Sequence, residues 1–301
     1  MKTAAKQLTT YGNLGLVQFK VEPETDFIFR PAGPEIKTGG LIISESTGEG
    51  VVGKLTAVNN TVMYLLLTDA DILVGAKQNR VINKSMLIAP MSKTVIDVSC
   101  IERLRWQYTS KNFSIPGAVV DPDLRKEKTR SLSFKKNDPE EKITNTQSKV
   151  WSHVHERIQE VGCPSRTESY AELINYCMDK EGNEFPVFEP ENGCNGLAVI
   201  IDKKVISADL FGREEVYKHY FPMLRDSAFR MVHQGKKDKS IDIHEAYYKA
   251  LETLDNFEAA ERHPDSNYLG AGLFNIVETP DIVGFELALD GQLIHNAFFA
   301  K

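Results

Sequence analysis

Two short polar clusters interrupt apolar sequence in the first third of the chain. Their residues carry positive charge, amides and aromatic rings: Lys77, Gln78, Asn79 and Arg80 in the first cluster, and Arg103, Arg105, Trp106 and Tyr108 in the second. Arg presents a planar fork that suits a phosphate or carboxylate, and Lys presents a point charge. Gln and Asn can bind hydroxyls or base edges, while Trp and Tyr can stack on a nucleobase. Together the clusters predict a site for an anionic, ring-bearing ligand.

Two carboxylates beside these clusters are the candidate catalytic residues. Asp71 precedes the first cluster, and Glu102 opens the second. A carboxylate serves as general acid or base only if its position or pKa is tuned. Residues 101–136 hold nine Lys or Arg and four Asp or Glu, a local net charge of +5 in a chain of net charge −6. A positive island in an acidic protein favours a specific anionic ligand over a generic polyanion.

The same residues also have ordinary structural explanations. Residues 77–80 can form a solvated loop in which Asn79 fixes a turn. Glu102 can pair with a neighbouring Arg at the surface for little energy, and Trp106 can belong to the core. The two interpretations differ in an observable way. Cations that converge on a pocket indicate a ligand site, whereas cations paired with carboxylates in a dry interior indicate a scaffold.

The elements that must position these clusters are strands. Residues 14–108 read as short apolar or β-branched runs punctuated by Gly, Pro, Asn and Ser, which is typical of an antiparallel sandwich or barrel. The runs at residues 85–89 and 94–100 are expected to form a hairpin. That pairing would bring Arg80 and Glu102 to one rim of the sheet.

The rest of the chain changes character twice. Residues 120–146 are densely charged and poor in apolar residues, so we expect an exposed linker or loop. From residue 147 on, apolar residues recur at helical spacing in several segments. Strand hairpins are predicted at Asp202-Lys203 and Asp290-Gly291. The sequence thus predicts an α+β protein: a β-rich portion over 1–119, a linker over 120–146, and a small antiparallel sheet with helices over 147–301. The portions can pack as one domain.

Composition bounds the class of protein. A net charge of −6 argues against a generic nucleic-acid or membrane-surface binder. No apolar run approaches the roughly 18 residues of a membrane helix, and no secretory signal is visible. The four cysteines are scattered, which favours a cytoplasmic protein with free thiols. We expect no metal site, and the sequence indicates neither a cofactor nor an oligomeric state.

The motifs GAKQNR at residues 75–80 and SCIERLRW at residues 99–106, followed by Tyr108-Thr109-Ser110, carry a family likeness. With residues 147–151, residues 196–211 and the closing segment that contains His295, they resemble the ADP-ribosylglycohydrolase- and rhodanese-phosphatase-associated protein family, type one. The resemblance implies a component of NAD-utilising or ADP-ribose-processing pathways. It also implies His295 as a residue of the site. Asp71 stands where the family pattern has Glu.

Three functions remain open from the sequence. In the first, the protein binds or processes an ADP-ribose-like nucleotide. Phosphates would then be held by the four cations Lys77, Arg80, Arg103 and Arg105, and ribose hydroxyls would be oriented by Gln78 and Asn79. In the second, the protein is a non-catalytic scaffold for partner enzymes. In the third, residues 125–136 and Trp106 bind an RNA end, which the acidic balance disfavours.

Overall fold

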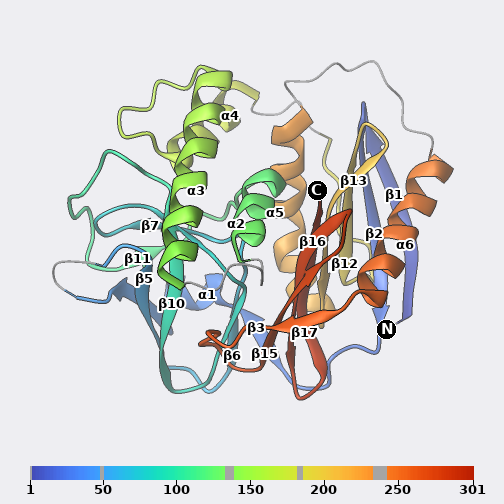
Figure 1. The fold of residues 1–301 in the computed structure, drawn as a ribbon, viewed down its shortest axis with the longest axis horizontal. Coiled ribbons are helices and arrows are strands. Elements are labelled where there is room, and N and C mark those ends of the chain that lie inside the picture. The colour runs from blue at the N-terminus through green and yellow to red at the C-terminus, as the bar shows by residue number, and fades with distance from the viewer. Residues whose placement is uncertain (1, 48–50, 133–138, 182–185, 233–242) are drawn as a thin grey trace.

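The computed structural model describes residues 2–47, 51–132, 139–181, 186–232 and 243–301 (Figure 1). Over these residues the protein is α+β, with strands in three sheets and six helices. The helices are α1 Ala32–Thr38, α2 Pro122–Ser131, α3 Pro139–Val161, α4 Tyr170–Glu181, α5 Glu214–Val232 and α6 Ile243–Ala259. No helix in the described ranges has the length and apolar character needed to cross a membrane.

The largest sheet joins the two ends of the chain. Within the described residues its strands run, in spatial order, β1 Lys2–Tyr11, β2 Leu14–Glu22, β12 Gly196–Ile201, β13 Lys204–Phe211, β17 Gln292–Ala300, β16 Ile282–Leu289, β15 Leu273–Glu278 and β14 Arg262–Pro264. All its pairings are antiparallel. The first hairpin therefore pairs with strands from the C-terminal half, because β2 lies against β12. The C-terminal sheet is larger than the small one expected from the sequence.

Helices α5 and α6 cover the two faces of this large sheet, as Figure 1 shows. On α6, Ala246, Ala250, Leu254 and Phe257 recur at spacings of three and four residues and pack on the outer face. On α5, a longer apolar stripe packs on the inner face and faces the rest of the molecule. Each fully buried Leu or Phe of these stripes contributes about 1.5–3 kcal/mol.

The other two sheets enclose a common core, as expected for a sandwich or barrel. The described strands of one sheet run β11 Phe113–Ser114, β7 Ile72–Gly75, β8 Arg80–Ile82, β10 Ser92–Cys100, β5 Lys54–Asn59 and β4 Leu41–Glu45. Those of the other run β3 Phe29–Pro31, β6 Tyr64–Leu67 and β9 Met86–Ile88, with β3 parallel to β6. Side chains from both sheets share one apolar cluster, and the edge strands β11 and β4 contact each other. We call this part the barrel.

The predicted hairpin between residues 85–89 and 94–100 is wrong. Strand β9 pairs with β6, whereas β10 pairs with β5 and β8. A three-residue strand carries too little local pattern to fix its partner. The expected outcome for the rim nevertheless holds, because Arg80 lies opposite Cys100 in the β8–β10 pair.

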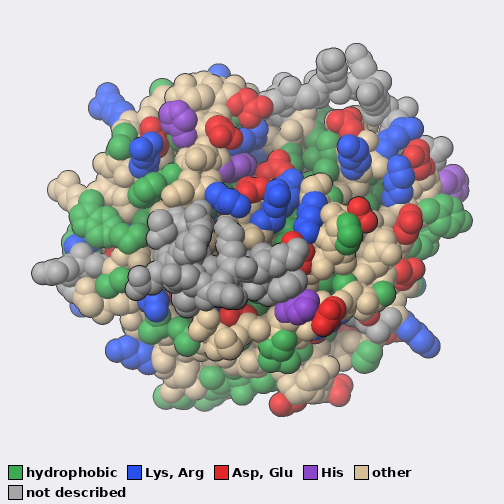
Figure 2. All heavy atoms as spheres, viewed as in Figure 1, with side chains coloured by type: hydrophobic (Ala, Val, Ile, Leu, Met, Phe, Trp, Pro, Cys, Tyr) green, Lys and Arg blue, Asp and Glu red, His purple; other side chains and the backbone are tan. Residues whose placement is uncertain are grey.

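The exposed linker expected over 120–146 is also wrong for its first part, residues 120–132, which is largely helical and buried. Asp121 caps α2 by accepting a hydrogen bond from the Leu124 backbone NH at 2.9 Å, and Pro122 occupies the first turn. The side chains of Arg125 and Lys128 are buried in spite of their charge. Acidic and basic side chains gather over the region of α2 in Figure 2. Residues 133–138 of the expected linker lie outside the described residues.

Candidate functional site

The two polar clusters of the sequence meet in space. The backbone NH of Asn79 donates to Glu102 Oε2 at 3.1 Å, and the Ile101 NH donates to the Asn79 carbonyl at 3.0 Å. Arg105 Nη2 lies 2.6 Å from the same Glu102 oxygen. The prediction that the GAKQNR loop and the SCIERLRW turn lie side by side is confirmed.

Glu102 is nearly fully buried and bonded on both carboxylate oxygens. Its Oε1 accepts from the Thr167 hydroxyl at 2.9 Å, which ties the rim to the segment before α4. Burial acts to raise the pKa of Glu102, but hydrogen bonds from Arg105, Asn79 and Thr167 outweigh it and lower the pKa below its usual value. The carboxylate is therefore a structural anion that fastens the rim.

The guanidinium groups of Arg105 and Arg103 also contact groups of the protein itself. Arg105 Nη1 donates to the Ala76 carbonyl at 2.8 Å and to the Gln107 carbonyl at 2.9 Å. Arg103 is half exposed, 3.6 Å from Glu168. Both guanidinium groups thus contact groups of the protein, and the phosphate-binding role expected for them stays a prediction.

Arg80 is fully buried and incompletely paired. Its Nη1 donates to Gln78 Oε1 at 3.0 Å, and its Nη2 lies 3.6 Å from Glu45 Oε1. Within the described part of the chain, Arg80 Nε and Nη2 and Glu45 Oε2 have no hydrogen-bond partner. A buried ion pair whose polar atoms lack hydrogen-bond partners contributes little to the stability of the fold, because the cost of desolvation offsets the attraction between the charges.

The exposed part of the rim is aromatic. The side chains of Trp106 and Tyr108 are 47% and 46% exposed. Lys77 Nζ lies 5.2 Å from each ring centroid, within cation–π range of both. We call these three side chains the aromatic platform. Beside it lies a cavity of about 790 Å³, lined by Tyr108, Lys111, Glu45, Ile42 and several small polar residues.

Asp71 and His295 lie elsewhere. Asp71 Oδ2 accepts hydrogen bonds from the Thr68 NH at 2.7 Å and from the Tyr220 hydroxyl at 2.9 Å. Burial raises the pKa of Asp71 to about 6. The carboxylate thus ties the β6–β7 turn to α5, and none of its hydrogen bonds reaches the aromatic platform.

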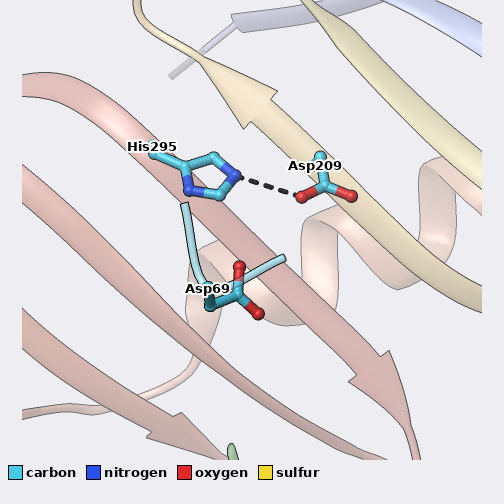
Figure 3. A group of neighbouring side chains, drawn as sticks. All are labelled: Asp69, Asp209 and His295. Carbon is cyan, nitrogen blue, oxygen red and sulfur yellow. Dashed lines mark hydrogen bonds and ion pairs between the residues drawn. The ribbon is translucent and has the colours of Figure 1, made fainter. Parts of the chain in front are cut away.

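His295 belongs to a buried network that the sequence did not reveal (Figure 3). His295 Nε2 lies 3.0 Å from Asp209 Oδ1. Arg125 forks between two carboxylates: it bonds Asp69 at 2.9 and 2.8 Å, and Asp209 at 2.9 and 2.6 Å. We call Asp69, Arg125, Asp209 and His295 the buried network. Burial acts to raise the pKa of Asp209, but the Arg125 charge and the hydrogen bonds with His295 and Arg125 together outweigh burial and lower that pKa to about 2.

Three members of the buried network carry metal-ligand atoms. Asp69, Asp209 and His295 offer ligand atoms that lie within 4.8 Å of one another. Arg125, however, already bonds both oxygens of both carboxylates. A divalent cation would have to displace a guanidinium that is held by four hydrogen bonds, so the donor set does not fit a metal. Arg125 comes from the segment expected to be an exposed linker, so its local sequence does not indicate a buried partner.

The chain matches a known protein family over nearly its whole length. A family model described as the ARG and Rhodanese-Phosphatase-superfamily-associated Protein domain (ARPP-1) matches residues 2–299. The chain belongs to this family. The resemblance seen in the GAKQNR and SCIERLRW motifs is thereby confirmed. No curated protein and no solved structure matches the chain.

This ARPP-1 chain holds one further polar pair that the sequence did not reveal. His153 Nε2 lies 3.1 Å from Asp121 Oδ2, and the Tyr170 hydroxyl donates to the same oxygen. Burial acts to lower the pKa of His153, but the charge of Asp121, its hydrogen bond and the charge of Asp123 together outweigh burial and raise that pKa. The pair borders a cleft of about 690 Å³ between α2 and α3, whose Lys and Arg residues pair with neighbouring carboxylates.

Of the basic loop expected of an RNA-end binder over residues 125–136, the described part lies in and directly after α2, and residues 133–136 lie outside the described residues. Arg125 and Lys128 are buried, and Lys128 Nζ bonds the backbone carbonyls of Asp69 and Ile82, the latter at 2.6 Å. Burial lowers the pKa of Lys128 to about 7. These two cations are therefore unable to meet a nucleic acid in the folded ARPP-1 chain.

Proposed function

We propose that this chain binds an ADP-ribose-like nucleotide at the aromatic platform, and that the platform recognises its ligand without catalysing a reaction. One observation carries the proposal. Trp106 and Tyr108, two large aromatic side chains, stand nearly half exposed with the Lys77 ammonium 5.2 Å from both rings. Exposed aromatics beside a cation are well suited to a ligand that is both planar and anionic.

Size and chemistry support a nucleotide. The adjoining cavity of about 790 Å³ lies within the range of small-molecule sites. Stacking of one base on an aromatic side chain contributes about 1–3 kcal/mol, and Lys77 and Lys111 supply positive charge near it. The family is named for its association with ARG and rhodanese-phosphatase proteins, which is the context in which an ADP-ribose-like ligand would occur.

Recognition is favoured over catalysis because the candidate acids are not accessible. Asp71 and Glu102 are both buried, and each is held by hydrogen bonds from the protein. A general acid or base must come within hydrogen-bond reach of the reacting atom. Neither carboxylate can do so without breaking the contacts that hold the β6–β7 turn and the rim.

A non-catalytic scaffold is the second candidate, and a specific observation favours it. Among the described residues, Arg80 pairs with Glu45, Arg105 with Glu102 and Arg103 with Glu168. Cations already paired with carboxylates stabilise the rim and leave fewer charges for a ligand. We also propose a cytoplasmic location, which the four buried, free cysteines support.

The two candidates separate in one titration. Isothermal calorimetry with ADP-ribose should show binding to wild type, and Trp106→Ala should weaken it by about 10-fold or more. Tyr248→Ala is the matched control, because Tyr248 is an exposed aromatic on α6, away from the platform. If wild type gives no heat with ADP-ribose, ADP or AMP, the nucleotide proposal fails and the scaffold remains.

A further inference from the structure

A second cavity, of about 730 Å³, lies on the outer face of the large sheet near the end of α6. Its walls are the loop of residues 23–26, the β16–β17 turn and Glu258 in the last turn of α6. We call it the acidic cavity. It shares no lining residue with the cavity beside the aromatic platform.

Three polar side chains line this cavity from adjacent strands of the sheet. Asn275 on β15 lies opposite Glu286 on β16, and Glu286 lies opposite Asn296 on β17. Elsewhere this face is apolar and packs under α6, with Phe298 and Val277 among its residues. A row of polar side chains on an otherwise apolar face loses the stabilisation that apolar packing would provide. Such buried polar side chains are informative and suggest a function at this position.

The polar row carries open hydrogen-bond acceptors. Asn275 and Asn296 are only 5% and 2% exposed, yet their Oδ1 atoms have no hydrogen-bond partner among the described residues. The Asn275 Nδ2 group donates to Glu286 Oε1 at 3.2 Å, which fixes the orientation of that amide. Each unsatisfied buried acceptor costs about 1–3 kcal/mol. A donor-bearing ligand would satisfy both.

The charged side chains in the described lining of the cavity are all acidic. Its described lining includes five carboxylates, contributed by Glu24, Asp26, Glu258, Glu286 and Asp290, and no Lys, Arg or His. The nearby Arg262 pairs with one of them, because its Nε and Nη2 each donate to Glu286 Oε2 at 3.4 Å while its Nη1 donates to the Phe257 and Glu258 carbonyls at 2.8 Å. Five carboxylates and one paired cation leave a net negative charge. The cavity therefore offers acceptors and negative charge, which favour a cation.

The wall opposite the polar row is held in place. The Thr25 NH donates to the Gly212 carbonyl at 2.8 Å, and the Asp26 NH donates to Gln292 Oε1 at 2.7 Å. The Thr25 hydroxyl also donates to the Leu293 carbonyl. A Cβ at Gly212 would lie 1.9 Å from that carbonyl oxygen, so only glycine permits the close approach. The cavity is formed before any ligand arrives, which lowers the entropic cost of binding.

We propose that the acidic cavity binds a small organic cation carrying an ammonium or guanidinium group. Such a group donates several hydrogen bonds and accepts none, so it complements Glu286 and the open amide oxygens of Asn275 and Asn296. A bare metal ion fits less well. Among the described residues, the acids of this cavity do not bring three ligand atoms within coordinating range of one another, and the cavity volume suits a small molecule.

Calorimetric titrations with agmatine and with spermidine test the proposal, with calcium chloride and uncharged 1,4-butanediol as comparison ligands. Wild type should bind at least one of the two organic cations more tightly than about 1 mM and should not bind the diol. Glu286→Gln keeps an acceptor for Asn275 and removes the charge, and it should weaken binding at least about 10-fold. Asp26→Asn, on the exposed rim, should weaken it less.

Asp281→Asn is the matched control. It removes one carboxylate from the start of β16, at the other end of the strand from Asp290, and Asp281 does not line the cavity. This variant should bind as wild type does. Binding of calcium without either organic cation would overturn the proposal, as would equal weakening in Asp281→Asn and Glu286→Gln. If Glu286→Gln has a lowered melting temperature, the test passes to Asp26→Asn and Glu258→Gln. Binding of the organic cations with wild-type affinity by both of these variants would also overturn the proposal.

Discussion

Arg125 and Asp209 are joined by two parallel hydrogen bonds, Nη1 to Oδ2 at 2.9 Å and Nη2 to Oδ1 at 2.6 Å. Asp209 lies on β13 of the large sheet, whereas the second carboxylate partner, Asp69, follows β6 of the barrel. One guanidinium from α2 therefore links the two β-structures of the molecule. All three side chains are buried, so water cannot replace any of them.

Removal of the Arg125 side chain should be severely destabilising. Arg125→Met leaves Asp69 and Asp209 buried without their counter-charge, and breaking such a network costs about 3–5 kcal/mol. Arg130→Met, at a half-exposed position of the same helix, should change stability by less than about 0.5 kcal/mol. Urea unfolding of both variants measures the difference. A loss below about 1 kcal/mol for Arg125→Met would contradict a linking role.

Asp71 should make stability fall as the solution becomes less acidic. Its folded-state pKa is raised by burial from 3.8 to about 6, so its protonated form is favoured in the folded protein. This stabilisation is fully present below pH 3.8 and is lost as the pH rises to about 6. The free energy of unfolding changes by about 3 kcal/mol over this range. Asp71→Asn removes this titration. We expect wild type to lose stability relative to Asp71→Asn across that window, measured by urea unfolding at successive pH values. Parallel profiles would contradict the burial argument.

His153 should give a second pH dependence at higher pH. Burial acts to lower its pKa, but the charge and the hydrogen bond of Asp121, with the Asp123 charge, outweigh burial and the Arg157 charge and raise the pKa above 6.5. The contribution of protonated His153 to the stability of the folded state is therefore fully present below pH 6.5 and is lost as the pH rises through the folded-state pKa. His153→Gln should remove this loss. An NMR titration of the His153 ring protons checks the direction, and a pKa at or below 6.5 would refute it.

Glu102 should prove structural. Glu102→Ala leaves the Asn79 NH, the Thr167 hydroxyl and Arg105 without their acceptor and should cost about 1–3 kcal/mol of stability. Its effect on ADP-ribose affinity should be smaller than that of Trp106→Ala, because the carboxylate is buried beneath the rim. If Glu102→Ala lost ADP-ribose affinity but kept its stability, Glu102 would be a ligand-binding residue and the structural assignment would be wrong.

Local signals in the sequence predicted the elements well. The hairpins at Asp202-Lys203 and Asp290-Gly291 form with all four residues at positive φ, as the turn residues indicate. The helical spacing of apolar residues located α5 and α6. Strand β1 was missed because its side chains alternate between exposed and half-buried positions and form no apolar run. The meeting of the two polar clusters was predicted correctly, although by a hairpin that does not form.

The buried charges could not have been predicted from local sequence. Arg125 lies among charged neighbours that are ordinarily exposed, and its partners Asp69 and Asp209 are distant in the chain. Whether a charge is buried depends on a partner supplied by the tertiary fold. For the same reason the sequence could not show that Arg80 forms an ion pair with Glu45 and that Arg105 forms one with Glu102. The exposure of the aromatic platform likewise emerges only from the fold.

Tryptophan fluorescence tests the nucleotide proposal most directly. The chain contains two tryptophans, Trp106 and Trp151. In a Trp151→Phe variant the emission comes from Trp106 alone, and stacking of an adenine on that ring should quench it in a saturable way during titration with ADP-ribose. Ribose 5-phosphate, which has no base, should leave the emission unchanged. Absence of quenching by ADP-ribose, while the variant stays folded by circular dichroism, would contradict binding at the aromatic platform.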